Sequence, residues 1–284
     1  MHLNRRKFNF LYLFLILFIN GCVSTEPEKL RGCYSIDDFY RSDNTGNADG
    51  FSIQLQESAS WIGKYKFFDE PDGKYVKFWF ERNQDTESYS DRARVQLNMY
   101  SLADVKDFYL NTSFSLDPSL SNYLDEGDAF EWLNLFELWV EPGWSDTLYP
   151  AKIHLRIVKN SDDNYFSPVI SAQYKDTTDN KWYSLWEKYI NIRVSPSQVY
   201  HFKFYLSISP AQTINASITD SNFENIASID IKDKFTHPDY HGIDTVYWGV
   251  NPIKLYTGES LLNRLDENNA SLSIIYNDFD FCAL

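Results

Sequence analysis

The chain has 284 residues, including 21 Phe, 20 Tyr and 8 Trp, and carries a formal net charge of −14 at pH 7. This length suits one large β domain or two small ones, and the abundance of aromatic residues favours antiparallel sheets over helices. A strongly acidic chain binds nucleic acid and anionic bilayers poorly, so we expect neither partner. Kinase and esterase activity have no support, because the sequence has no glycine-rich nucleotide loop and no nucleophile-elbow serine.

The first 21 residues predict an export signal. A basic start, MHLNRRK, precedes an apolar run that is short for a membrane span. The run ends in Ile19-Asn20-Gly21-Cys22, which resembles the bacterial lipobox, whose cysteine is acylated and becomes the first residue. We expect residues 1–21 to be removed and Cys22 to carry acyl chains such as palmitate. Residues 22–32 would then tether the protein to the bacterial cell envelope, at the outer membrane surface; an ordinary signal peptide or an anchor helix is the alternative.

Two further cysteines, Cys33 and Cys282, stand near the ends of the expected folded part, residues 33–284. An exported protein folds in an oxidising compartment, which favours a disulfide between them. Two free thiols are the alternative, because proximity is not readable from sequence. No linker or internal repeat interrupts this part, so we expect a single domain and a monomer.

Alternating apolar and polar residues predict a long series of strands separated by turns rich in Asp, Asn and Gly. The segment 259–265 alone predicts a helix. So many strands are typical of an all-β sandwich or barrel. The expected strands are 51–57, 60–67, 75–81, 93–100, 107–116, 131–140, 151–159, 168–174, 200–208, 213–219, 226–231, 245–250, 253–257 and 270–281.

Several strands carry cations, amides or aromatic rings on their polar side, because successive side chains of a strand point to opposite faces. Within 131–140, the same alternation groups Glu137 and Trp139 on one face. Such faces often meet solvent, but their agreement in an acidic chain favours one shared, basic and aromatic-lined groove. The polar sets are Arg94, Gln96, Asn98 and Tyr100; Lys152, His154 and Arg156; His201, Lys203, Tyr205 and Ser207; and Lys254 and Tyr256.

The order of these segments resembles the concanavalin A-like jelly roll of polysaccharide lyases and laminarinase-type glucanases, whose concave sheet binds a sugar chain. In alginate-lyase-like members an Arg/Glu-bearing strand, a Gln-x-His strand and a late Tyr/Lys strand occur in that order. Here SDRARVQL (90–97), AKIH (151–154) and VYWGVNPIKLYTG (246–258) resemble them. The first has Arg94 and Gln96 where an acid and a second Arg are expected, and the second has Lys152 in place of Gln.

The resemblance implies an all-β, concanavalin A-like jelly-roll sandwich of two antiparallel sheets with a concave ligand groove. It also implies an anionic polysaccharide, either uronate or sulfated, as the partner. Cleavage by β-elimination requires a group that neutralises the uronate carboxylate, a base and an acid. The first role suits Arg94 with Gln96 or Asn98, the second suits His154, and the third suits Tyr256 or Tyr205. The other expected substrate-binding residues are Glu137, Trp139, Lys152, Arg156, Lys203 and Lys254.

Two further functions stay open beside the lyase. A glycan-binding lipoprotein without catalysis would use Trp139, Trp144 and Tyr256 as sugar-stacking platforms, with Trp132 and Trp182 assigned to the core. A laminarinase-type hydrolase would use the pair Glu137 and Glu141, although Trp139 stands where that motif has an Asp.

The sequence predicts no metal site and no cofactor. His237 and His241 flank a loop, HPDYH, but no cysteine or carboxylate pair reinforces them as metal ligands. A structural divalent cation in the Asp- and Asn-rich turns stays open. The central expectation is therefore geometric: Arg94, Glu137, His154, Lys203 and Tyr256 should gather in one groove.

Overall fold

The computed structural model describes residues 32–45, 51–56, 61–83, 92–102, 104–123, 130–141, 150–162, 165–208, 212–222, 226–240 and 247–284. The expected signal segment 1–21 and the expected lipid anchor, Cys22, lie outside these ranges. Within the ranges, no helix has the length and apolar character needed to cross a membrane.

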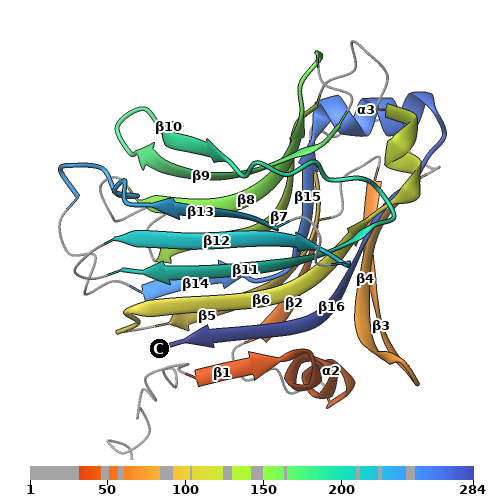
Figure 1. Cartoon of the computed structure of the whole chain (residues 1–284), viewed down its shortest axis with the longest axis horizontal. Helices are drawn as coiled ribbons and strands as arrows, with labels where there is room; N and C mark the ends of the chain where they lie inside the picture. Colours follow the sequence, from red (N-terminus) through yellow and green to blue (C-terminus); the bar gives the residue numbers. More distant parts are fainter. Residues whose placement is uncertain are drawn as a thin grey trace, which may run out of the picture.

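Two antiparallel sheets make up most of the protein (Figure 1). The first, here called the β16 sheet, has the order β13 (Ile226–Ile231), β12 (Thr213–Asp220), β11 (Val199–Ser207), β6 (Asp107–Leu116), β16 (Leu272–Ala283), β4 (Gly73–Arg82) and β3 (Trp61–Glu70), with β1 (Gly32–Ser35) also paired to β16. The second, the β7 sheet, has the order β10 (Lys181–Tyr189), β9 (Ser167–Asp176), β8 (Ala151–Lys159), β7 (Phe130–Glu141), β14 (Tyr247–Asn251), β5 (Arg92–Leu102) and β15 (Lys254–Gly258), with β2 (Phe51–Gln56) also paired to β5.

The sheets pack against each other because alternate residues of each strand are apolar and face inward. From the β7 sheet, Val95 and Leu97 of β5 are buried in the core, and from the β16 sheet Phe202 and Phe204 of β11 are buried there too. The rings of Phe136 and Phe204 lie 4.9 Å apart between the two sheets. The structure thus confirms the expected all-β jelly-roll sandwich of two antiparallel sheets.

A bulge in β7 changes which of its side chains face the core. The register between β7 and β8 shifts between Asn134 and Phe136, and both Leu135 and Phe136 belong to the core. Uniform alternation predicts these two on opposite faces, which is wrong here because a bulge adds one residue to the strand. As a result, Trp132 and Asn134 lie on the same face as Glu137.

β14 and β15 form one interrupted line between the same two neighbours. β14 pairs with one half of β5 and of β7, and β15 pairs with the other half of each. The interruption falls at Pro252 and Ile253. It places Asn251 and Lys254, the residues on either side of it, next to each other on the outward face, where their side chains form a hydrogen bond.

Two strands and one α-helix are missing from the sequence prediction: β1, β10 and α2 (Ile36–Thr45). The alternation of β10 is broken by a register shift between Ser184 and Trp186. The start of α2 does carry a sequence signal, because the backbone N–H and the hydroxyl of Ser35 donate to Asp38 at 2.8 and 3.0 Å. This is the Ser-x-x-acid spacing of a capping box. The expected helix 259–265 is present as α3 (Glu259–Glu267), and a short 3-10 helix, η1 (Pro118–Tyr123), follows β6.

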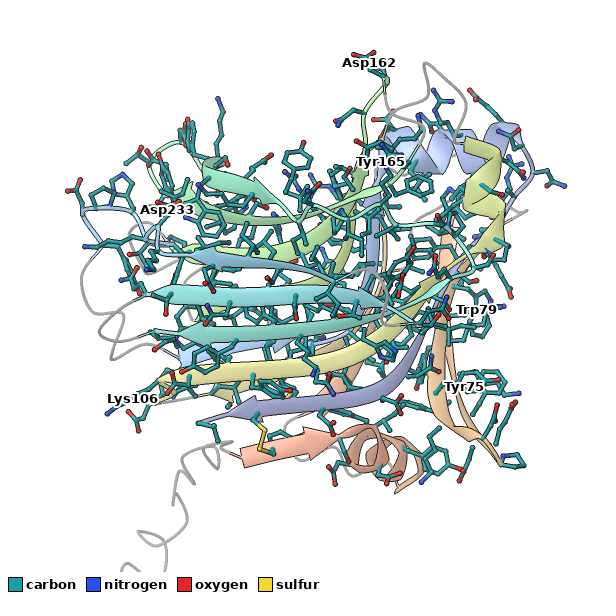
Figure 2. The ribbon with its side chains drawn as sticks, viewed as in Figure 1. Tyr75, Trp79, Lys106, Asp162, Tyr165 and Asp233 are labelled. Atoms are coloured by element: carbon teal, nitrogen blue, oxygen red, sulfur yellow. A yellow bond between two sulfur atoms is a disulfide. The ribbon has the colours of Figure 1, made fainter. Side chains whose placement is uncertain are left out.

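The disulfide expected between Cys33 and Cys282 is present and joins β1 to β16 (Figure 2). The two residues are directly opposite each other in the sheet register and are separated by 249 positions in the sequence. A crosslink that closes so long a loop restricts the unfolded chain strongly, which stabilises the folded state.

Gly63 of β3 lies against the backbone of β5, beside Arg94. A Cβ atom at this position would lie 2.7 Å from the carbonyl oxygen of Arg94 and 2.7 Å from Cγ2 of Val95. Because backbone cannot move aside as a side chain can, Gly63→Ala should lower the free energy of unfolding by about 1–3 kcal/mol in chemical denaturation. Gly258→Ala is the matched comparison, since its Cβ would meet the ring of Trp132 at 2.9 Å and a ring can rotate. Equal losses from the two substitutions would contradict this account.

Candidate functional site

The outward face of the β7 sheet carries a dense set of polar side chains, here called the polar floor. Most of them lie between apolar neighbours that point into the core, as the alternation of the strands requires. Many floor residues are buried although they face away from the core, because they cover one another. The floor residues are Arg94, Gln96 and Asn98 of β5; Asn134 and Glu137 of β7; Lys152, His154 and Arg156 of β8; Ser171 of β9; Asn251 of β14; and Lys254 and Tyr256 of β15.

The structure therefore brings together most of the residues expected in one groove. Trp139 also lies on this side, where it contacts Tyr100 edge to face and is 6% exposed. A cavity of about 330 Å³ opens over the part of the floor formed by β2, β5, β7, β14 and β15. Its lining consists of Gln54, Arg94, Gln96, Tyr100, Glu137, Trp139, Asn251 and Lys254.

Lys203 and Tyr205 were expected in the same groove, and this expectation is wrong. Both belong to β11, which lies in the β16 sheet, and both are exposed on that strand's outward side. The hydroxyl of Tyr205 donates to Asp107 at 2.7 Å, and this hydrogen bond raises the pKa of Tyr205. Alternation shows that a strand has a polar side, but it does not show to which sheet the strand belongs.

The centre of the floor is a buried ion pair between Glu137 and Lys254, whose side chains are 8% and 2% exposed. Burial by itself raises the pKa of Glu137, but the ammonium groups of Lys254 and Lys152 outweigh it and hold that pKa below its usual range. Burial lowers the pKa of Lys254, and Glu137 opposes this shift. The Lys254 ammonium also donates to Asn251 Oδ1 at 3.3 Å.

A chain of side-chain amides extends from this pair toward β2. The Lys254 ammonium and the backbone carbonyl of Leu97 determine which way the first amide, Asn251, is turned. Asn251 Nδ2 donates to the carbonyl of Leu97 at 3.0 Å, and this nitrogen also donates to Asn98 Oδ1. Gln96 Nε2 then donates to the same oxygen at 2.7 Å and to Gln54 Oε1 at 2.8 Å. Gln96 Oε1 is consequently left without a hydrogen-bond partner among the described residues, although it is buried.

Aromatic rings cover two of the cations at the sides of the floor. The Arg94 guanidinium lies 4.4 Å from the centre of the Tyr256 ring, and Trp132 meets that ring edge to face at 4.7 Å. The Lys152 ammonium lies 4.2 Å from the Trp182 ring. Assigning Trp132 and Trp182 to the core is thus wrong: the bulge turns the first outward, and the second belongs to β10, which the sequence prediction missed.

His154 and Ser171 lie side by side on β8 and β9 and are almost completely buried, at 3% and 0% exposure. Within the described ranges, the two ring nitrogens of His154 have no hydrogen-bond partner, and the hydroxyl of Ser171 has none either. Burial, reinforced by the neighbouring Lys152 ammonium, lowers the pKa of His154 well below its usual value. At neutral pH the imidazole is therefore uncharged and has a nitrogen lone pair that can accept a proton.

Tyr276 of β16 supports the floor from the opposite sheet. Its hydroxyl reaches through the core to the carbonyl oxygens of Leu135, at 3.1 Å, and of Lys254, and it accepts the backbone N–H of Lys254 at 3.3 Å. Leu135 is the residue at the β7 bulge, and Lys254 follows the break between β14 and β15. One side chain thus holds both irregular points of the β7 sheet.

The remaining expectations concern metals and a hydrolase pair. Among the described residues, no three His, Cys, Asp or Glu side chains gather as metal ligands. His237 packs on the ring of Tyr174 at 4.7 Å, and His241 lies outside the described ranges. The side chain of Glu141, the second member of the hydrolase pair, and Trp144, a proposed stacking platform, also lie outside them.

Neither the family models nor the curated protein sequences give a match to the chain. Among solved structures it is similar to an endo-β-1,4-glucuronan lyase from the fungus Trichoderma reesei (9% identity, 82% of this chain and 90% of that chain, TM-score 0.48). It is also similar to an alginate lyase from Pseudomonas aeruginosa (12%, 88% and 91%, 0.35) and to the winged bean acidic lectin bound to methyl-α-D-galactose (12%, 83% and 92%, 0.39). At these identities and scores, the comparisons carry no argument about activity or ligand.

The buried ion pair predicts a characteristic response to mutation. Lys254→Met should lower the free energy of unfolding at pH 7 by about 3–5 kcal/mol, because it leaves the Glu137 carboxylate buried without its counter-charge. The double variant Glu137→Gln/Lys254→Met should recover most of this loss, since no buried charge is then left unpaired. Urea denaturation measures both, and a double variant as unstable as Lys254→Met would contradict the assignment.

Urea denaturation of the same variants at lower pH provides a second check of the ion pair. Because folding lowers the pKa of Glu137, its contribution to stability is complete above the unfolded value of about 4.3. It is lost as the pH falls through the lower pKa of the folded state. The double variant should lack this acid-sensitive part of the stability, which would appear as a shallower decline below pH 5 than in the unmodified protein.

Proposed function

We propose that the protein binds an anionic polysaccharide of uronate units on the polar floor and cleaves it by β-elimination. The observation that carries this proposal is the buried, uncharged His154 with two unpaired ring nitrogens, set among the cations Lys152, Arg156 and Lys254. An uncharged base beside groups that neutralise a carboxylate is what proton removal next to that carboxylate requires.

In this reaction a cationic side chain of the floor binds the uronate carboxylate and acidifies the proton on C5. His154 takes that proton, the C4–C5 double bond forms, and the bond from C4 to the glycosidic oxygen breaks. The Tyr256 hydroxyl donates a proton to the leaving oxygen. β8 and β15 are separated by β7, so the two strands lie about 10 Å apart and the side chains can reach the two sides of a sugar ring.

Binding without cleavage is the second candidate, and the aromatic covers of the cations favour it. Arg94 is stacked on Tyr256 and Lys152 on Trp182. Rings held beside cations suit the recognition of an anionic sugar chain, with the rings packing on sugar faces and the cations pairing with carboxylates or sulfates. In this case the floor is a lectin-like surface, and His154 is a buried polar residue without a chemical role.

Unsaturated products distinguish the two candidates, because the new double bond absorbs ultraviolet light. The domain should release such products from at least one of polyglucuronate, alginate or polygalacturonate. His154→Ala and Tyr256→Phe should each slow the release by about 10²–10⁴-fold, the usual contribution of an acid or base. Tyr205→Phe, on the other sheet, is the control and should leave the rate unchanged.

Retardation in gels containing these polysaccharides, without any product, would favour the lectin-like surface instead. Release that is unaffected by both His154→Ala and Tyr256→Phe would remove the proposed roles of these two residues. Circular dichroism of each variant checks that the sandwich still forms.

We also propose that the protein is an exported lipoprotein anchored through Cys22. The supports are the basic start, the short apolar run and the Gly21-Cys22 pair. In a bacterial host fed radioactive palmitate, the full chain should become labelled and sediment with membranes, and Cys22→Ala should lose both properties. A Cys22→Ala chain that is still labelled would contradict the anchor.

A further inference from the structure

An ion pair spans three strands of the β7 sheet above the floor. Arg156 of β8 pairs with Glu187 of β10, and β9 lies between those strands. In the sheet register, Arg156 is opposite Val169 of β9, while Glu187 is opposite Ser171. The pair therefore crosses β9 diagonally, on the outward side of Ser171.

The residues beside and beneath this bridge are those whose polar atoms have no partner. Ser171 has His154 as its neighbour on β8 and Glu187 as its neighbour on β10. Ser171 Oγ and both nitrogens of His154 are buried and unpaired. On the other side of His154, Lys152 reaches toward Trp182 and also crosses β9. The two crossings thus flank His154 and Ser171, which are both almost completely buried.

The Arg156–Glu187 pair is suited to exchange. The side chains of Glu187 and Arg156 are 38% and 13% exposed, and Glu187 lies on the last strand of the sheet. Ion pairs with an exposed partner contribute little to stability and are weakened by salt. The Glu137–Lys254 pair, at 8% and 2% exposure, is buried and cannot be exchanged in this way. Arg156 also keeps an unpaired, buried Nε atom, so its donors are not all used by Glu187.

We propose that Arg156 is the carboxylate-binding group of the floor and that Glu187 occupies it when no ligand is present. The proposal rests on the proposed function in taking a uronate as the ligand. The uronate carboxylate replaces the Glu187 carboxylate on the Arg156 guanidinium, which offers donors in a fork that matches a carboxylate. As Glu187 leaves, the crossing opens and exposes His154 and Ser171 to the sugar. Glu187 thus competes with the ligand for Arg156, and only a ligand that carries a carboxylate can displace it.

The test is Glu187→Gln, which keeps the size of the side chain and removes its charge. Two measurements are independent of turnover: the rate at which diethyl pyrocarbonate modifies His154, followed by peptide mass spectrometry, and the affinity for a glucuronate oligomer, followed by calorimetry. In Glu187→Gln both should rise, the affinity by about twofold to fivefold, the range that an exposed ion pair contributes. Modification of His201 and His237 in the same samples should not change.

Asp233→Asn is the matched control, because it breaks the Lys188–Asp233 ion pair, which also involves β10 but not the floor. It should leave both measurements unchanged. In Arg156→Gln, the affinity for the glucuronate oligomer should fall, while that for a neutral glucose oligomer should not. If Glu187→Gln leaves both His154 modification and glucuronate affinity unchanged, the competitor role is overturned.

The outcomes separate this proposal from the lyase. If unsaturated products form but Glu187→Gln changes neither His154 modification nor glucuronate affinity, the proposed elimination stands and the competitor role of Glu187 is overturned. Faster modification and tighter binding in Glu187→Gln, without products from any variant, would keep the competitor and assign it to a binding surface.

Discussion

The ion pair between Glu137 and Lys254 is the interaction on which the polar floor depends. Of the floor residues as defined, Glu137 alone is a carboxylate, and the cations around it include Arg94, Lys152 and Lys254. Without it, several positive charges would share a poorly hydrated surface and repel one another. The pair thus lets the sheet hold an excess of basic groups on one face of an acidic protein, where they can meet an anionic ligand.

The opposite sheet holds the backbone beneath this ion pair. The β7 bulge and the break between β14 and β15 both leave strand pairing irregular, and irregular pairing exposes backbone groups that need partners. Tyr276 meets that need at Leu135 and Lys254. Its hydroxyl stays protonated, since burial raises its pKa. The β16 sheet, whose outward face contributes nothing to the floor, therefore still holds the backbone that carries the Lys254 ammonium.

The sequence predicts the floor well within each strand and poorly between strands. The period of two correctly groups Arg94 with Gln96, and Lys152 with His154, because a strand's geometry is local. The misplacement of Lys203 has a different origin: the sheet that β11 joins is decided by its pairing with β6, far away in the sequence. Such long-range pairing leaves no mark in the residues of one strand. The bulge that turns Trp132 outward is likewise invisible to uniform alternation, since it appears only in the register with β8.

Folding stability does not explain why the floor keeps several buried polar atoms without hydrogen-bond partners. A buried donor or acceptor without a partner costs about 1–3 kcal/mol, and here Gln96 Oε1, Asn134 Oδ1, Ser171 Oγ and the His154 nitrogens share one face. Several are acceptors, which suit hydroxyl groups, and they lie among cations, which suit carboxylates. A sugar acid offers both kinds of group on one ring. This combination of acceptors and cations supports the proposed uronate ligand over a neutral glycan or a simple anion, and that support is independent of whether cleavage follows binding.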